Sequence, residues 1–299
     1  MKKISIVPNT LKDENYLETK NLIKYLSLYE CKIFFEDIHK SDLYDFCKNI
    51  GINYSFVPRN ILFSEANFLI ALGGDGTIIE IAVDAAKYEI PIVGINVGTL
   101  GFLTQTDKGD YSAIKDVIDN NYGLTECMML DISIISKDNQ EICNFLALND
   151  LIVTGDSYKM ITTSTSVDGT NMGRYSADGL IVSTAIGSTA YSLSAGGAVM
   201  HPEVDAMIIT PICPHTLKAR STVIPGNSTV EITQIPPFRT EAVARADGKI
   251  IYKFKDSSEK IRIKKSKYTT LLVKQEHTNF FDVLRNKLSC LLYTSDAAD

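Results

Sequence analysis

The sequence contains no tryptophan and few histidines, 4 in 299 residues. None of these histidines stands at metal-ligand spacing from another histidine or from a cysteine, so structural or surface roles explain them better than a metal centre. The 6 cysteines are scattered, with no Cys-x-x-Cys pair. A disulfide framework or a zinc site is therefore disfavoured, and free thiols in a reducing cytosol are the better interpretation.

Long apolar runs and a surplus of basic charge are also absent. No apolar stretch reaches the roughly 18 residues that a membrane-spanning helix requires, and the start of the chain lacks the pattern of a secretory signal. The formal net charge is -6, whereas nucleic-acid-binding proteins usually present a basic face. We therefore expect a cytoplasmic protein that binds neither membranes nor nucleic acid, although backbone N–H groups and local cations could still bind a nucleotide.

The hydrophobic content, 45%, is enough for one large domain or two medium ones. Residues 1–103 alternate continuous apolar stretches with segments of helical periodicity, which predicts a Rossmann-like α/β domain built on a parallel sheet. Residues 104–265 carry short runs of Ile, Val and Thr separated by turn residues, which predicts a mostly-β domain. A helix is expected at 279–288, so that residues 266–288 complete the first domain. The tail, 289–299, resembles a sequence that is not native to the protein, and it does not enter the fold prediction.

The stretch Leu69–Glu80, LIALGGDGTIIE, joins an apolar strand to a helix through a glycine-rich turn. Backbone N–H groups at a helix start bind phosphate, aided by the helix dipole. The turn matches neither a Walker A loop nor the dinucleotide motif G-x-G-x-x-G. Asp75 in its middle should repel a phosphate, and a tight turn with Asp75 in solvent is the structural alternative.

Two further polar segments follow apolar strands. The stretch Gly94–Phe102, GINVGTLGF, comes after the next predicted strand, and the carboxyl ends of neighbouring parallel strands form one ligand-binding edge. A flexible interdomain linker is the alternative. Asn149 and Asp150 interrupt the apolar run FLALNDLIV, where an unpaired polar group would cost about 1–3 kcal/mol. They are candidate contacts to a base edge and to ribose hydroxyls, or else the turn at a strand end.

The longest segment of this kind is Ala177–Pro202, which is dense in glycine, serine and threonine. A strand precedes the stretch STAYSLSAGG, where Ser188 is the expected N-cap of a short helix. Small residues allow a flat ligand to approach the backbone, and Tyr191 offers an aromatic face or a hydroxyl. A small-residue packing helix is the alternative, but binding residues concentrate in such loops.

Together these segments resemble the NAD kinase family, the ATP- or polyphosphate-dependent NAD kinases. The similarity runs through LGGDGT, GINVGTLGFLT, LND, ADGLIVSTAIGSTAYSLSAGGAVMHP and TPICPHTL, in that order. GGDGT alone also occurs in diacylglycerol and sphingoid lipid kinases, so the long GSTAYSLSAGG segment carries the specificity. The resemblance implies an α/β domain, a β-sandwich-like domain, a C-terminal helix that returns to the first domain, and a homodimer or homotetramer.

The resemblance also implies a reaction and a set of residues. NAD would be phosphorylated on the 2′-hydroxyl of its adenosine ribose to give NADP, with ATP or polyphosphate as donor and Mg²⁺ or another divalent metal. Asp75 would be the general base, and no metal ligand is assigned. The phosphate loop would comprise Gly73, Gly74, Gly76 and Thr77. The residues implied to bind NAD are Asn149, Asp150, Lys159, Asp178, Thr189, Ala190, Tyr191, Ser192, Leu193 and Ser194.

The sequence departs from the family pattern at three positions. Asp150 replaces the usual glutamate and is one methylene shorter, Ile186 replaces a hydroxyl residue, and Lys249 stands where glutamine is frequent. Two other functions stay open from the residues alone. A lipid kinase of the GGDGT type is disfavoured by the acidic pI of about 5.3, and a dinucleotide-binding sensor is disfavoured by the carboxylate of Asp75. ATP and polyphosphate are equally compatible with the sequence.

Overall fold

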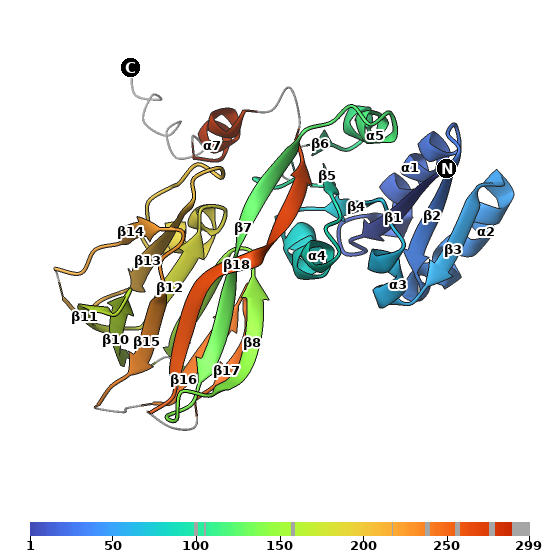
Figure 1. The fold of residues 1–299 in the computed structure, drawn as a ribbon. Helices are drawn as coiled ribbons and strands as arrows, with labels where there is room; N and C mark the ends of the chain where they lie inside the picture. Colours follow the sequence, from blue (N-terminus) through green and yellow to red (C-terminus); the bar gives the residue numbers. More distant parts are fainter. Residues whose placement is uncertain are drawn as a thin grey trace, which may run out of the picture. The chain divides into compact units, whose positions relative to one another are not determined.

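The computed structural model describes residues 1–98, 101–104, 106–156, 159–216, 218–236, 240–254, 258–274 and 279–288. The chain forms two compact units: Met1–Glu126 with Thr270–Asp299, and Cys127–Thr269 (Figure 1). The change of sequence pattern after residue 103 precedes this division, because β6 (Thr106–Asp107) and α5 (Ser112–Ile118) still belong to the first unit. The expected tail, 289–299, lies outside the described residues. Within the described ranges, no helix is long and apolar enough to cross a membrane.

The first unit contains a parallel sheet in the order β3-β2-β1-β4-β5, with the end of β18 beside β5. Every residue of β4 and β5 is buried, as expected for strands covered on both faces. The strands are β1 (Lys2–Pro8), β2 (Cys31–Glu36), β3 (Asn53–Val57), β4 (Phe68–Gly73) and β5 (Ile92–Asn96). The helices are η1 (Glu14–Tyr16), α1 (Leu17–Leu26), η2 (Asp37–His39), α2 (Lys40–Ile50), α3 (Arg59–Ser64), α4 (Asp75–Lys87), α5 and α7 (Phe280–Leu288). The predicted α/β fold with a parallel sheet is confirmed.

The second unit is built of two antiparallel sheets. One has the order β14-β13-β12-β9-β16-β17, and the other has the order β11-β10-β15-β18-β7-β8. The strands of the first are β9 (Asp150–Gly155), β12 (Gly179–Thr184), β13 (Ala206–Ile212), β14 (Thr222–Pro225), β16 (Ala242–Ala246) and β17 (Lys249–Lys253). Those of the second are β7 (Leu124–Ile135), β8 (Glu141–Ala147), β10 (Ile161–Val167), β11 (Thr170–Ala177), β15 (Val230–Gln234) and β18 (Lys260–Val273). The mostly-β, sandwich-like prediction is confirmed.

Alternation along β9 and β12 divides their side chains between two faces. Leu151 and Leu180 belong to the large core shared with the other sheet, as do residues two positions further along each strand. Ile152 and Ile181 point the opposite way, toward a smaller cluster that includes Ala195. Two short helices, η3 (Gly187–Thr189) and α6 (Tyr191–Ser194), follow β12 and precede Ala195. This second face of the sheet therefore carries the glycine- and serine-rich segment.

Candidate functional site

The glycine-rich turn lies between β4 and α4, as the sequence indicates. Gly74 is the N-cap of α4, and its carbonyl accepts the N–H of Thr77 at 2.9 Å. Gly73 cannot carry a side chain, because a Cβ there would overlap with the hydroxyl of Thr77. That hydroxyl also accepts the side-chain amide of Asn9 at 3.0 Å, which fixes the loop after β1 against the turn. A Cβ on Gly76 would meet nothing within 4 Å, so the outer side of the turn is open.

Asp75 is fixed by hydrogen bonds from the second glycine-rich segment. Its Oδ2 accepts the N–H of Phe102 at 2.8 Å, and its Oδ1 accepts the N–H of Leu103 at 2.9 Å. The N–H and the hydroxyl of Thr104 also donate to Oδ1, at 3.1 and 3.3 Å. A Cβ on Gly101 would overlap with the Asp75 carboxylate. The two glycine-rich turns therefore meet at the carboxylate, at the carboxyl ends of the neighbouring strands β4 and β5. Thr99 and Leu100 lie outside the described residues.

The C-terminal helix α7 supplies a cation to the same carboxylate. Lys287 Nζ is 3.9 Å from Asp75 Oδ2 and 4.6 Å from the centre of the Phe102 ring. On the same helix, the ring of Phe280 lies 6.1 Å from that of Phe102. Sequence reasoning missed Lys287, since no local pattern indicates which strand edge a distant helix will contact.

In the second unit, Asn149 lies directly against the start of η3. Thr184 links them, because its hydroxyl donates to the carbonyl of Leu148 at 2.7 Å and accepts the N–H of Gly187 at 3.0 Å. A Cβ on Gly187 would overlap with the carbonyl oxygen of Asn149. The glycine is therefore required for close approach of two backbone segments, and it brings the Asn149-Asp150 pair to the glycine- and serine-rich helix region.

Asp150 is nearly fully buried, with 3% of its surface exposed. Burial, and to a lesser extent the nearby carboxylate of Asp247, raises its pKa to about 7. Asp247 accepts the backbone N–H groups of Leu148, Asn149 and Asp150, at 2.8, 2.8 and 3.2 Å. Burial also raises the pKa of Asp247, although these hydrogen bonds and the positive charge of Lys249 oppose the shift. Asp247 is not among the residues that the sequence indicates for the site, yet its carboxylate holds the Asn149-Asp150 backbone in place.

The segment from residue 188 to 194 divides into buried and exposed side chains. Ser188 is not the N-cap expected from the sequence, because η3 begins one residue earlier. The hydroxyl of Ser188 instead donates to the carbonyl of Ala185 and accepts the N–H of Met200. Ser192 is buried and hydrogen-bonded to Thr210 at 3.0 Å, so its hydroxyl is used in packing. Tyr191 is 44% exposed and remains available to a ligand. The remaining side chains are half-buried, in Thr189, Ala190 and Leu193, or exposed, in Ser194.

Asp178 and Lys159 are not brought to this region. The register pairs Gly179 with Thr154 and Ser183 with Asp150, so Asp178 precedes the opposite end of β12. Lys159 lies at that same far end, because its backbone carbonyl is packed against Gly155. The predicted NAD-binding residues thus form two groups, at opposite ends of β9 and β12.

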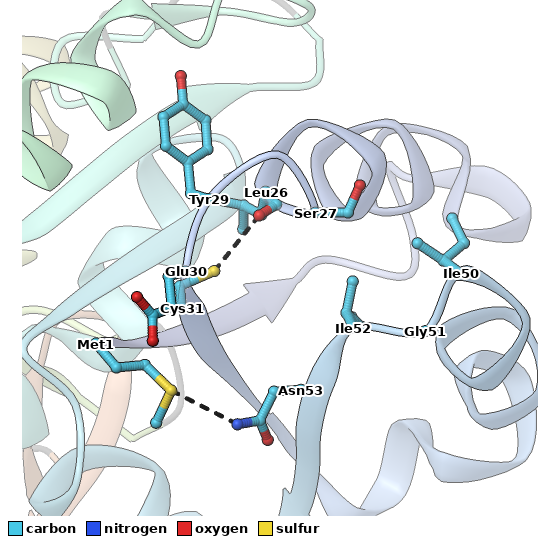
Figure 2. Close-up of a pocket in the computed structure, with 10 residues that line it drawn as sticks. All are labelled: Met1, Leu26, Ser27, Tyr29, Glu30, Cys31, Ile50, Gly51, Ile52 and Asn53. Carbon is cyan, nitrogen blue, oxygen red and sulfur yellow. Dashed lines mark hydrogen bonds between the residues drawn. The ribbon is translucent and has the colours of Figure 1, made fainter.

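A cavity of about 340 Å³ lies elsewhere in the first unit (Figure 2). It adjoins the amino ends of three parallel strands, where Met1, Cys31 and Asn53 stand, and Asn53 donates a weak hydrogen bond to the sulfur of Met1. The glycine turn follows the carboxyl end of β4. The cavity is therefore at the opposite edge of the sheet from the predicted phosphate loop.

No group of three or more His, Cys, Asp or Glu side chains that could hold a metal ion occurs among the described residues. Mg²⁺ often binds through substrate phosphates, waters and only one or two carboxylates. Asp75 is the carboxylate at the turn, but its oxygens already accept four hydrogen bonds. The described side chains therefore do not form a magnesium site of their own.

Family models and similar proteins of known function all point to one family, the NAD kinases. Residues 4–122 match the ATP-NAD kinase N-terminal domain, and residues 148–275 match the ATP-NAD kinase C-terminal domain. The NAD kinase of Caldanaerobacter subterraneus subsp. tengcongensis is 37% identical over 291 residues, covering 97% of this chain and 99% of that protein. The NAD kinase of Symbiobacterium thermophilum is 41% identical over 234 residues, covering 78% of this chain and 82% of that protein.

Solved structures agree on the fold. Yeast NADH kinase complexed with NADH has a TM-score of 0.85 at 23% identity, covering all of this chain and 89% of that one. The NAD kinase from Archaeoglobus fulgidus in complex with ATP has a TM-score of 0.66 at 24% identity, covering 96% and 98%. Since both halves of the sequence match and a relative at 37% identity spans nearly its whole length, the chain belongs to the NAD kinase family and is a phosphotransferase that converts NAD to NADP.

Proposed function

We propose that the chain phosphorylates the 2′-hydroxyl of the adenosine ribose of NAD, with ATP or polyphosphate as donor and Asp75 as general base. The observation that carries this proposal is the fixed carboxylate of Asp75 at the start of α4, flanked by Gly74 and Gly76. A dinucleotide sensor has no need of a carboxylate in a phosphate turn. A kinase needs an acceptor for the hydroxyl proton as the new bond to phosphorus forms.

The hydrogen bonds of Asp75 indicate which oxygen accepts the proton. Oδ1 receives three donors, from Leu103 and Thr104, whereas Oδ2 receives only the N–H of Phe102 and lies near Lys287. Because each carboxylate oxygen has two lone pairs, Oδ2 keeps capacity for one more hydrogen bond. The Asp75 side chain is 27% exposed, so a substrate hydroxyl can reach it. We assign Oδ2 as the proton acceptor.

The proposed step is an in-line transfer. The ribose oxygen attacks the terminal phosphorus of the donor, the bond from that phosphorus to the leaving oxygen breaks, and the hydroxyl proton passes to Oδ2 of Asp75. Backbone N–H groups at the start of α4 orient the transferred phosphoryl group, aided by the helix dipole. The absence of a side chain at Gly76 leaves room for this approach, whereas a Cβ on Gly74 would overlap with the ammonium of Lys12.

The second unit is proposed to bind the dinucleotide. The Asn149 amide can pair with a base edge, and the exposed ring of Tyr191 can stack on a flat heterocycle. With a pKa of about 7, Asp150 carries a proton in a large fraction of molecules at neutral pH. Its carboxyl can therefore donate a hydrogen bond to a ribose hydroxyl as well as accept one. Asp178 and Lys159 are candidates for a separate contact at the far end of the same strands.

We also propose the remaining properties that the resemblance implies: dependence on Mg²⁺ or another divalent metal, a cytoplasmic location, and a homodimer or homotetramer. Bound to the donor, the metal would neutralise charge on its phosphates. Loss of activity with a chelator and recovery with Mg²⁺ would support the first. Light scattering of the purified protein measures the mass of the assembly.

The test compares the wild type with Asp75→Asn for NADP formation from NAD, ATP and Mg²⁺. We expect the variant to lose at least about 100-fold in kcat while its affinities for NAD and ATP change only slightly. Thr104→Val is the matched control, since it removes one donor to Oδ1 and leaves Oδ2 untouched; its kcat should stay within about threefold of wild type. Unchanged turnover in Asp75→Asn would refute the base. NAD binding without NADP formation by the wild type would favour a sensor, and phosphorylation of a sphingoid base or diacylglycerol instead of NAD would favour a lipid kinase.

A further inference from the structure

We infer that Lys287, in the last turn of the C-terminal helix α7, is a positioning residue for phosphoryl transfer: it holds the Asp75 carboxylate and the Phe102 ring in their working arrangement. This inference rests on the proposed role of Asp75. It assigns to α7 a part in the reaction that neither the glycine-rich motifs nor the NAD-binding segment contains.

Asp75 places a negative charge in a turn that is proposed to receive the phosphates of the donor. The carboxylate and the phosphates are both negative and therefore repel each other. The hydrogen bonds from Phe102, Leu103 and Thr104 come from neutral groups, which leave the net charge in place. Lys287 brings a positive charge to 3.9 Å from Oδ2. It therefore offsets the charge of the carboxylate on the side of the oxygen that the substrate hydroxyl would use.

Lys287 contacts both partners of one hydrogen bond, because Phe102 donates its N–H to Oδ2 and presents its ring to the Lys287 ammonium at 4.6 Å. A cation over an aromatic face is attracted by the ring quadrupole. Phe280, two turns earlier on α7, packs against the same ring. The helix α7 thus restrains the segment Gly101–Thr104 through contacts with the ring of Phe102, while the Lys287 ammonium faces the Asp75 carboxylate.

The side chains of Lys287 and Asp75 are 30% and 27% exposed, so the pair is partly shielded from solvent and less weakened by screening than a surface pair. Arg285 on the same helix offers a contrast, since it is 71% exposed and pairs with Asp282 within α7. Arg285 is therefore a matched control: it is a second cation on α7, and its ion pair is with a residue of α7 itself.

The experiment uses Lys287→Met, Lys287→Arg and Arg285→Ala in the full-length protein. We expect Lys287→Met to lower kcat about 10- to 100-fold with KM for NAD nearly unchanged, because the loss is one of positioning. Lys287→Arg should recover most of that loss, and Arg285→Ala should match the wild type. Hydrogen exchange in the absence of substrate should be faster at the amides of Phe102–Thr104 in Lys287→Met and unchanged in Arg285→Ala.

Two outcomes would overturn the inference. One is wild-type kcat in Lys287→Met. The other is a reduced kcat with wild-type exchange at Phe102–Thr104, which would mean that the ammonium acts on a substrate directly rather than through the loop. Failure of the proposed function gives a different result, since Asp75→Asn would then keep its turnover regardless of the kcat of Lys287→Met. If Lys287→Met does not fold, Lys287→Arg still tests the inference. Because the charge is retained in an altered geometry, any loss of kcat should be small and accompanied by a small increase in exchange at Phe102–Thr104, and a loss of kcat without that increase would overturn the inference.

Discussion

The buried carboxyl of Asp150 should make the stability of the protein depend on pH, and Asp150→Asn should remove most of that dependence. The pKa of Asp150 rises from 3.8 to about 7 in the folded protein. Below about pH 4 both the folded and the unfolded states are protonated, so the group has no effect. Between about pH 4 and about pH 7 the unfolded carboxyl ionises while the folded one keeps its proton, so the free energy of unfolding falls with rising pH.

The size of this effect follows from the shift. Each unit of pKa difference corresponds to about 1.4 kcal/mol, so the full loss is about 4 kcal/mol, complete once the folded carboxyl has also ionised above about pH 7. Between about pH 5 and about pH 8 the expected loss is roughly 2–3 kcal/mol, or roughly 5–10 °C in Tm. Asp247 adds to the slope in the same direction, since its pKa is also raised. The asparagine variant should therefore keep only the part due to Asp247.

The assay is denaturant or thermal unfolding of the ligand-free protein at a series of pH values. Asp138→Asn is the matched control, because Asp138 is exposed in a turn of the same unit. The control should follow the wild-type slope, and Asp150→Asn should be the more stable protein above about pH 7, since it has no buried charge to ionise. If Asp150→Asn and the wild type show the same slope between about pH 5 and about pH 8, the burial argument for Asp150 is wrong.

Three further substitutions test the turn at Gly73–Thr77 and the start of η3. Gly187→Ala should destabilise the protein by about 2–4 kcal/mol in chemical unfolding and weaken NAD binding in titration, because the new methyl overlaps with the Asn149 carbonyl; wild-type stability would contradict this. Gly76→Ala should leave stability equal or higher, since its Cβ meets open space in a helix, but should raise KM for ATP several-fold by filling the turn; an unchanged KM would show that donor phosphates do not approach there. Thr77→Val should cost about 1–2 kcal/mol in unfolding by removing the acceptor of the Asn9 amide, and no loss would mean that this bond contributes nothing.

The sequence was sufficient for the fold and for the position of the glycine turn. Continuous apolar strands alternating with helices predicted a parallel sheet, and β4 and β5 are buried at every position. The turn Gly73–Thr77 was predictable because its signal is local: an apolar run stops at two glycines and a helical pattern starts at once. The meeting of this turn with Gly94–Phe102 was also expected, since neighbouring parallel strands end at one edge.

The partners of the two carboxylates were not predictable in the same way. Asp75 is held by backbone groups 27 to 29 residues away and by Lys287 at the far end of the chain, and Asp247 is held by groups 97 to 99 residues away. Such contacts depend on the register of strands and on where a distant helix packs, which no local pattern encodes. For the same reason the run of NAD-binding candidates could not reveal that Asp178 lies at the opposite end of β12 from Asn149.

The placement of Asp75 bears on how a glycine turn that is proposed to receive phosphate can contain a carboxylate at all. A free aspartate there would repel the donor and would move with solvent. In this chain Oδ1 is occupied by donors from one loop, which fixes the side chain, and Oδ2 faces a lysine, which offsets its charge. The two oxygens are therefore unequal: Oδ1 accepts three hydrogen bonds from the loop, whereas Oδ2 accepts one, from Phe102, and keeps capacity for the proposed substrate hydroxyl. Loss of activity in Asp75→Asn would reflect both, and for that reason Thr104→Val, which perturbs only the anchoring oxygen, is the variant that separates the chemical role of Asp75 from its structural one.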